Sequence, residues 1–573
     1  MNERRSVRTL PTRLRRLPAS VGLVTVALVT IPAPGVHAAT LTVTTLADSG
    51  PGSFRQAVLD ANASAGTDVI DLTGLAGTIA LTGGWVQITD SVQITGPGAP
   101  TLTIDAGGGL IGLEVIAAAP IRVSISGVRV SGATAAGGRA IDSTNASLTL
   151  DGVQAVGNGR GVYVSAFDDP ANTVVIRDSV VSGNTQNGGL VVANTVAGSA
   201  VTIERTTIAD NRAPGGFGAG ILLSGAADVT VADSTVARNV AGTEGGGVEV
   251  VYSTGRTLIT RSSIVGNTAG TSGGGIYLAA TSRPVEIANS TVAGNIALGP
   301  LGGGGIHADD GAALTLRTAT VVGNSAGATG GGLYVDHGTV TIDSSILAGN
   351  SAAAGVEDLG PAVGPTFELA YSLVQRAAAV PVVDLAGSFV GIDPLLEAFD
   401  ATTGTASPSA GSPVLEAGNP ADLADPSDQL GRPRRFNRLD MGAVERQALP
   451  VYPPAFGLVE PAITAVDGAP IAGGIGVTSA PSPVLSGTGR PGAQIVVYTA
   501  DRSAPIGPAP PSGVPVCSAI VGADGTWSCR LADLPTGGYD LVPYATSGGS
   551  AVTGPTVHVL VSIATAEILP ATE

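Results

Sequence analysis

The side chains best suited to bind a ligand recur at one position of a periodic pattern. After each of a series of glycine clusters comes an apolar, usually alternating tripeptide such as "IYL", whose middle residue has apolar neighbours. Because side chains alternate across a strand, these middle residues face away from the core. We name this set the column, and it comprises Tyr163, Val191, Leu222, Glu249, Tyr277, His307 and Tyr334.

Two acidic positions accompany the last members of the column. Aligning the repeats places Asp309 beside Asp336 and Asp310 beside His337. Aromatic faces can stack on sugar rings, and carboxylates can accept hydrogen bonds from sugar hydroxyls or coordinate Ca²⁺. We therefore predict a glycan-binding stripe, with Ca²⁺ as an optional ion and no other cofactor. Ordinary cross-strand stacking is the alternative interpretation. The candidate stripe is Tyr163, Glu249, Tyr277, His307, Tyr334, Asp309 and Asp336, and the Ca²⁺ candidates are Asp309, Asp310 and Asp336.

An enzyme is the competing interpretation. A polysaccharide lyase needs several acidic Ca²⁺ ligands near a basic residue, and a glycoside hydrolase needs two carboxylates at reaction spacing. The acidic doublets Asp168-Asp169 and Asp309-Asp310 have no Arg next to them in sequence. We predict a protein without catalytic residues, acting in adhesion or glycan binding or as a stalk that displays its C-terminal module.

A second periodicity predicts the elements that position the column. An Asn ends a short apolar run at intervals of 26 to 29 residues, and each repeat contains three short strand-like pieces. Such a period is typical of stacked repeats, and three strands per turn predict a right-handed parallel β-helix. We expect the Asn to occupy a sharp bend in the left-handed region, with their amides stacked in a ladder. The Asn are Asn158, Asn184, Asn211, Asn239, Asn267, Asn295, Asn324 and Asn350.

Composition and the N-terminus indicate export. Six Arg precede an apolar stretch at residues 21–31, and "VHA" ends at Ala38, which is typical of a signal peptide over residues 1–38. The apolar stretch is too short to span a bilayer, and no other segment of membrane length follows. The net charge is −17, and the 28 basic residues are all Arg. An acidic chain without basic clusters argues against nucleic acid as a partner.

The ends of the predicted solenoid carry further motifs. Ser53 and Gln56 form a capping-box pattern, followed by an apolar stripe, so residues 39–68 predict a cap that includes a helix. The segment "TLTVTTLADSGPGSFRQAVLDANASAG" resembles the start of secreted bacterial β-helix proteins of the pectin-lyase-like fold. "GSPVLEAGN" and "DQLGRPRRFNRLDMGAVE", within residues 391–447, resemble a choice-of-anchor Q closing segment, and the repeats are similar to those of polymorphic outer-membrane adhesins. These resemblances imply a bacterial surface or extracellular protein, with a β-helix over residues 39–447.

A separate domain follows a Pro-rich linker at residues 448–461. The alternating runs and the "GADGTW" turn over residues 462–562 resemble a bacterial immunoglobulin-like β-sandwich. Cys517 and Cys529 are the only cysteines and predict a disulfide, although a two-residue Asp524-Gly525 hairpin would place Cys529 opposite Ile520 instead. The tail, residues 563–573, ends in "LPATE", an incomplete sorting signal.

Overall fold

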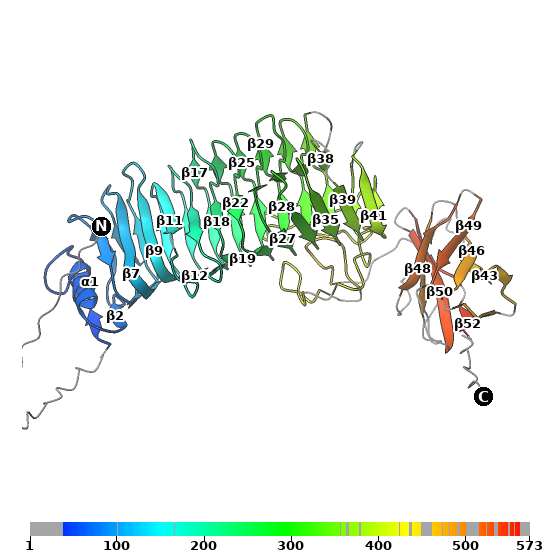
Figure 1. Cartoon of the computed structure of the whole chain (residues 1–573), viewed down its shortest axis with the longest axis horizontal. Helices are drawn as coiled ribbons and strands as arrows, with labels where there is room; N and C mark the ends of the chain where they lie inside the picture. Colours follow the sequence, from blue (N-terminus) through cyan, green and yellow to red (C-terminus); the bar gives the residue numbers. More distant parts are fainter. Residues whose placement is uncertain are drawn as a thin grey trace, which may run out of the picture. The chain divides into compact units, whose positions relative to one another are not determined.

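A computed structural model describes residues 38–561, with short internal gaps and longer ones at residues 448–460 and 500–514. Residues 1–37 of the predicted signal peptide, nearly all of the linker, and the tail lie outside the described residues. Parallel strands stack into a solenoid that starts beside the helix α1 (Phe54–Ala63) (Figure 1). Parallel strands joined by crossovers connect in the right-handed sense, and the solenoid is the right-handed β-helix that the repeats predict.

Three long faces and one short face make up each regular turn. The first face contains β4 (Val86–Ile88), β7 (Ile111–Ser126), β9 (Arg139–Asp151), β11 (Arg160–Ser165), β14 (Leu190–Thr195), β18 (Ile221–Gly225), β22 (Val248–Ser253), β26 (Ile276–Ala279), β30 (Ile306–Asp309), β34 (Leu333–Val335) and β38 (Leu359–Pro361). The second face contains β1 (Thr40–Thr42), β2 (Asp68–Asp71), β5 (Val92–Thr95), the distal parts of β7 and β9, β12 (Thr173–Arg177), β15 (Ala200–Glu204), β19 (Asp228–Ala232), β23 (Thr257–Thr260), β27 (Val285–Ala288), β31 (Leu314–Arg317), β35 (Thr339–Asp343), β39 (Thr366–Ala370) and β41 (Val382–Ala386).

The third face forms one continuous sheet, and the fourth face is short. The third face contains β3 (Gly77–Ala80), β6 (Leu102–Asp105), β8 (Arg129–Ser131), β10 (Gln154–Val156), β13 (Val180–Ser182), β16 (Thr207–Ala209), β20 (Thr235–Ala237), β24 (Ser263–Val265), β28 (Thr291–Ala293), β32 (Thr320–Val322), β36 (Ile346–Ala348), β40 (Leu373–Val374) and β42 (Phe389–Val390). The fourth face contains β17 (Arg212–Ala213), β21 (Val240–Ala241), β25 (Thr268–Ala269), β29 (Ile296–Ala297), β33 (Ser325–Ala326) and β37 (Ser351–Ala352).

The core of the solenoid is a continuous stack of aliphatic side chains. Ile276 and Leu278 of β26 are fully buried, as are Ile306 and Ala308 in the next turn. Identical inward positions therefore lie over one another, about 4.8 Å apart. The strands before residue 130, which precede the first ladder Asn, pair in parallel register like those of the later turns.

The predicted Asn ladder is present and fully buried. Asn239, Asn267 and Asn295 follow one another, and each accepts, through its Oδ1, hydrogen bonds from the main-chain N–H and the Nδ2 of the Asn before it, at 2.9–3.0 Å. The expected backbone conformation is wrong. None of the eight Asn has a positive φ; the residue before each one does, and in six cases that residue is Gly. The Gly turns the chain, which frees the Asn side chain to point along the stack.

A second ladder, which the sequence analysis missed, lies at the bend between the second and third faces. Ser262 Oγ accepts from the Ser234 N–H at 3.1 Å, and Ser290 Oγ accepts from the Ser262 N–H at 3.0 Å. The signal was visible, because a Ser or Thr stands five residues before most of the ladder Asn. Ala319 interrupts this series, and Ser345 resumes it.

The N-terminal cap forms as expected, with one difference. Ser53 caps α1 by accepting from the Gln56 N–H, and the predicted stripe of Phe54, Ala57, Val58 and Ala61 is buried. The Gln56 side chain donates to Asp60 instead of returning to Ser53, so the capping box is only half formed.

The segment predicted to close the solenoid instead lies along the third face (Figure 1, yellow). Gln429 bonds to Thr291 and Ser263, and the Ala443 N–H donates to Thr320. These partners point outward from β24, β28 and β32. Met441 and Val414 also pack on Ile346 of β36. Residues 391–447 therefore cover a side wall, because the third face is outwardly apolar or hydroxyl-bearing at these turns.

Residues 462–561 form a sandwich of two sheets with its own core. One sheet contains β44 (Ala469–Pro470), β43 (Ala462–Val466), β46 (Val484–Thr488) and β49 (Thr526–Arg530); the other contains β45 (Ile475–Thr478), β52 (Val557–Val561), β50 (Gly537–Ser547), β47 (Gln494–Thr499), β48 (Pro515–Ile520) and β51 (Ser550–Thr553). The disulfide joins Cys517 on β48 to Cys529 on β49. Since these strands belong to different sheets, the hairpin register expected from the sequence does not apply.

Candidate functional site

The column forms in the register that the repeats predict. On the first face, Glu249 pairs with Tyr277, Tyr277 with His307, and His307 with Tyr334. Tyr163, Val191 and Leu222 precede Glu249 in the same line. One continuous row of outward positions thus runs along the first face.

Outward orientation does not make every member accessible. Tyr277 and Tyr334 are half-buried, but His307 is only 1% exposed and Glu249 only 4% exposed. The His307 ring lies between the Tyr277 and Tyr334 rings, with centroids 5.2 and 4.9 Å away in edge-on geometry. The turn before β30 also folds back, and a Cβ added to Gly303 would lie 2.7 Å from the His307 Cβ. A glycan-binding stripe requires accessible side chains, and His307 does not meet that requirement.

Two carboxyl groups meet the aromatic row at its C-terminal end. Tyr277 Oη donates to Asp309 Oδ2 at 2.7 Å, between two adjacent turns of the solenoid. One ligand atom from each of His307, Asp309 and Asp336 lies within 4.8 Å of the other two. We call this group, with Tyr277 and Tyr334, the polar cluster.

The two carboxyl groups of the polar cluster differ in acidity. Burial raises the pKa of Asp309, but hydrogen bonds from Tyr277, Asp336 and the Asp310 N–H outweigh it and hold the pKa below its ordinary value. Burial and the Asp309 carboxylate raise the pKa of Asp336. A single proton shared between the two carboxyl groups, carried by Asp336, explains both the lowered pKa of Asp309 and the raised pKa of Asp336, as in other close carboxyl pairs.

Burial also determines the state of the neighbouring groups. It lowers the pKa of His307 to about 4, so the imidazole is neutral at pH 7. Burial raises the pKa of Glu249 to about 8, with a further contribution from Glu244. Both His307 ring nitrogens and Glu249 Oε2 are buried without a hydrogen-bond partner in the described part of the chain. Buried polar atoms without partners are uncommon and call for an explanation.

The predicted stripe divides into two parts. The apolar side chains of Val191 and Leu222 separate Tyr163 from Glu249. The Tyr163 ring lies under the Arg139 and Arg160 guanidinium groups, at 4.1 and 5.2 Å from their carbons. This end of the column is therefore occupied by its own cation–π contacts.

The column also continues beyond its predicted start. Asp142 pairs with Tyr163 on the first face, and Glu114 pairs with Asp142. Asp142 forms an ion pair with Arg139. The glycine pattern that marks the later turns is weaker here, so the sequence alignment did not reach these residues.

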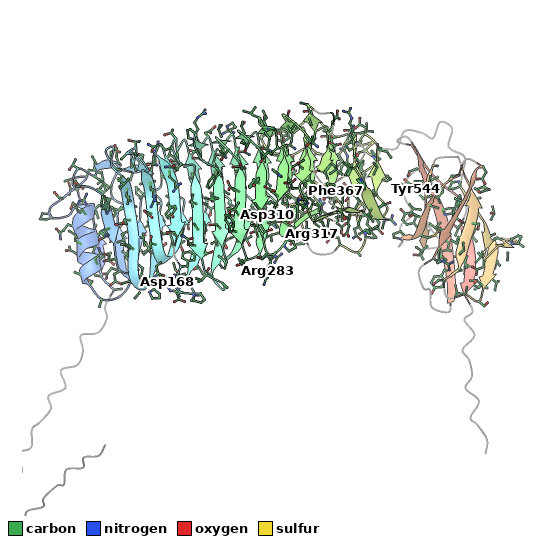
Figure 2. The ribbon with its side chains drawn as sticks, turned by 45° about the horizontal axis from the view of Figure 1, so that its top comes forward. Asp168, Arg283, Asp310, Arg317, Phe367 and Tyr544 are labelled. Carbon is green, nitrogen blue, oxygen red and sulfur yellow. A yellow bond between two sulfur atoms is a disulfide. The ribbon has the colours of Figure 1, made fainter. Side chains whose placement is uncertain are left out.

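Asp310 does not join the polar cluster. Its side chain is exposed, and only its main-chain N–H reaches the cluster, donating to Asp309 Oδ1 at 2.7 Å. Asp168 is also exposed and belongs to a different turn of the solenoid (Figure 2). Of the three Ca²⁺ candidates from the sequence, Asp309 and Asp336 lie close together, whereas Asp310 does not. His307 is the third residue whose ligand atom lies close to theirs.

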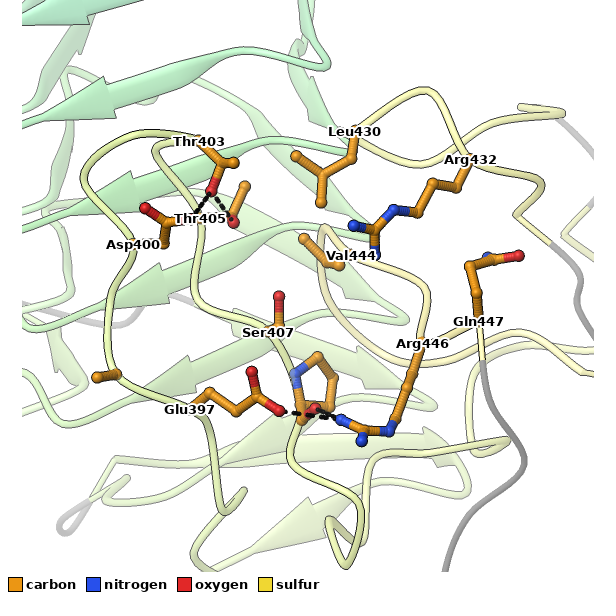
Figure 3. A pocket seen from close by; sticks show the side chains of 12 residues that line it. Glu397, Asp400, Thr403, Thr405, Ser407, Leu430, Arg432, Val444, Arg446 and Gln447 are labelled. Carbon is orange, nitrogen blue, oxygen red and sulfur yellow. Dashed lines mark hydrogen bonds and ion pairs between the residues drawn. The ribbon is translucent and has the colours of Figure 1, made fainter.

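A separate cavity of about 430 Å³ lies in the segment of residues 391–447 (Figure 3). The two carboxylates that line it are already partnered: Glu397 Oε1 accepts from Arg446 at 3.0 Å, and Asp400 accepts from Thr402 and Thr403. Arg432 and Gln447 complete its charged and polar rim. Because these carboxylates hold the loops together, the cavity offers fewer unpaired polar groups to a ligand than the polar cluster does.

Within the described part of the chain, no helix combines the length and hydrophobicity that a bilayer span requires. Residues 117–356 match the family model for a right handed beta helix region. No curated protein matches the chain.

Among solved structures, the chain is similar to the full-length tailspike protein 2 from Escherichia coli O157:H7 bacteriophage CAB120, at 10% identity and a TM-score of 0.29. The alignment covers 88% of this chain and 65% of the tailspike chain, so the chain spans less than two thirds of that protein's length. The family match and the strand pairings agree that residues 117–356 form a right-handed β-helix.

Proposed function

We propose that this protein is an extracellular, non-catalytic β-helix that binds a glycan at the polar cluster. The observation that carries the proposal is the line of Tyr277, His307 and Tyr334 beside Asp309 and Asp336. The two half-buried Tyr rings lie two turns apart, about 10 Å along the axis. The rings offer apolar area on which sugar rings can stack, and the carboxyl groups beside them can accept hydrogen bonds from sugar hydroxyls.

The proposed compartment follows from the sequence and the disulfide. A Cys517–Cys529 bond persists in an oxidising environment such as the cell exterior. The chain carries an acidic net charge of −17 and contains no Lys, which favours neutral or hydroxyl-rich partners over nucleic acid. The resemblances to a choice-of-anchor Q segment, to adhesin repeats and to an immunoglobulin-like module remain predictions.

A glycan array with the full chain tests the proposal. We expect reproducible binding that the double substitution Tyr277→Ala and Tyr334→Ala abolishes while the melting temperature stays within a few degrees. Tyr252→Ala is the matched control, because Tyr252 is 75% exposed and lies outside the column. Binding that survives the double substitution would move the site elsewhere, and no binding by the folded wild type would contradict the proposal.

A glycoside hydrolase or polysaccharide lyase is the second candidate. The opposite pKa shifts of Asp309 and Asp336 favour it, since an acid and a base with separated pKa values can share one reaction. Their shared hydrogen bond places them closer than the roughly 5 Å of a retaining pair or the wider gap of an inverting pair. Product released from pectate, alginate or a neutral polysaccharide, and lost in Asp336→Asn, would establish this second candidate in place of the first.

A further inference from the structure

We propose that the polar cluster is a binding site for a divalent transition-metal ion of the Zn²⁺ class, ligated by His307, Asp309 and Asp336. The proposal does not depend on glycan binding, because the ligands belong to the protein alone. It differs from the Ca²⁺ site expected from the sequence in both ligand set and metal class.

The geometry supplies three converging ligand atoms. One nitrogen of His307 and one carboxylate oxygen from each of Asp309 and Asp336 lie within 4.8 Å of one another. The main chains of β30 and β34 hold them, since His307 pairs with Tyr334 and the Asp336 N–H donates to Ala308 O at 3.0 Å. A tetrahedral ion with bonds of about 2.0–2.2 Å holds its ligand atoms about 3.4 Å apart, so binding would draw these side chains closer together.

The buried imidazole is the independent observation. His307 is 1% exposed, and neither ring nitrogen has a hydrogen-bond partner in the described part of the chain. An imidazole buried in this way leaves two polar atoms unsatisfied, which proteins rarely tolerate without an unseen partner. A metal ion beside Asp309 and Asp336 would bond one of these nitrogens directly.

The ligand types select the metal. Ca²⁺ and Mg²⁺ take oxygen ligands almost exclusively, whereas imidazole suits Zn²⁺, Ni²⁺, Cu²⁺ and Fe²⁺. Asp310, the extra oxygen ligand that a Ca²⁺ site would use, lies outside the cluster. A His with two carboxylates therefore fits a Zn²⁺-class ion that keeps at least one coordination position open.

Hydrogen bonds also hold the Asp309 carboxylate from behind. Tyr277 Oη donates to Asp309 Oδ2 at 2.7 Å, and the Asp310 N–H donates to Asp309 Oδ1 at 2.7 Å. Hydrogen bonds of this kind orient a ligating carboxylate and tune its affinity for metal. The two Tyr rings beside His307 fix the plane of the imidazole.

Calorimetric titration of the chelator-treated full chain with Zn²⁺, and separately with Ca²⁺, tests the proposal in the absence of any glycan. We expect one Zn²⁺ per chain, a Ca²⁺ affinity at least tenfold weaker, and a rise in melting temperature with Zn²⁺. Both His307→Gln and Asp336→Asn should weaken Zn²⁺ binding at least tenfold. Asp310→Asn is the matched control and should leave the affinity unchanged.

Asp336 is half-buried, so Asp336→Asn keeps the test decisive if His307→Gln fails to fold. Substitution with Co²⁺ gives a second readout, because loss of the imidazole ligand changes the visible spectrum. Absence of Zn²⁺ binding by the folded wild type would overturn the proposal. Zn²⁺ binding that both variants retain, or Ca²⁺ binding as tight as Zn²⁺ binding, would overturn it as well.

Discussion

Asp358 ends the Asn ladder by accepting from Asn350 in the way that a ninth Asn would. Asp358 Oδ1 accepts from the Asn350 N–H at 3.2 Å and from Asn350 Nδ2 at 2.8 Å. Its second oxygen accepts from the Arg376 N–H at 2.6 Å. Burial raises the pKa of Asp358 to about 6 despite these bonds. The end of the ladder is therefore closed by a side chain that accepts from donors in two directions.

Replacing Asn267 by Ala should lower the free energy of unfolding by about 1–3 kcal/mol. The substitution removes the acceptor of two Asn239 donors and the donor to Val236 O, all of them buried. Denaturant unfolding measures the change, and Asn187→Ala, at a half-buried Asn outside the ladder, is the control. Equal stability of the two variants would show that the ladder contributes little.

Replacing Gly275 by Ala should also destabilise the solenoid, by about 1–3 kcal/mol. A Cβ there would lie 2.5 Å from Gly305 O and 2.9 Å from Asn295 Nδ2, so the strand and the ladder would have to separate. Gly215→Ala is the matched control, because no atom lies within 4 Å of its added Cβ and its φ is not positive. Thermal unfolding of both variants checks the prediction, which a neutral Gly275→Ala would contradict.

Replacing Glu249 by Gln should change how stability depends on pH. The pKa of Glu249 is about 8 in the folded protein and 4.5 in an unperturbed chain. Between these values the folded state retains a proton that the unfolded state has released, so stability falls as pH rises from about 4.5 to about 8.

The Gln variant lacks this loss, and its advantage over the wild type should grow with pH to on the order of 2–4 kcal/mol by pH 8. Denaturant unfolding at several pH values measures the difference. Glu368→Gln, at a half-buried Glu on the second face, is the control. Parallel pH profiles for wild type and Glu249→Gln would rule out a neutral, buried Glu249.

Removing the disulfide by Cys517→Ser with Cys529→Ser should destabilise the sandwich by about 3 kcal/mol, the chain-entropy value for a loop of this length. The cores of the solenoid and of the sandwich share no residue, so the unfolding of the solenoid should stay unchanged. Calorimetry distinguishes the two transitions, and reduction of the wild type should reproduce the effect. A lowered solenoid transition would contradict separate cores.

The sequence by itself determined the repeat, its register and the identity of the column. Asn239, Asn267 and Asn295 are 28 residues apart, and a parallel stack requires such equal spacing to bring them together. The alternation around Tyr277, His307 and Tyr334 determined which side chains point outward, because a strand has a period of two. Such local patterns recur in every turn, so they can be recognised from the sequence alone.

Only the tertiary structure decided how accessible these residues are and what lies against them. His307 is buried because Tyr rings from the two neighbouring repeats and the glycine turn before its own strand close over it. Alternation within one strand carries no information about that cover. Asp358 completes the ladder only eight residues after Asn350, outside the repeat spacing. The course of residues 391–447 along the third face depends on single contacts such as Gln429 with Thr291, which have no period. The spacing of residues in the sequence thus determined the repeated strands and ladders, whereas long-range packing determined which of their side chains are buried.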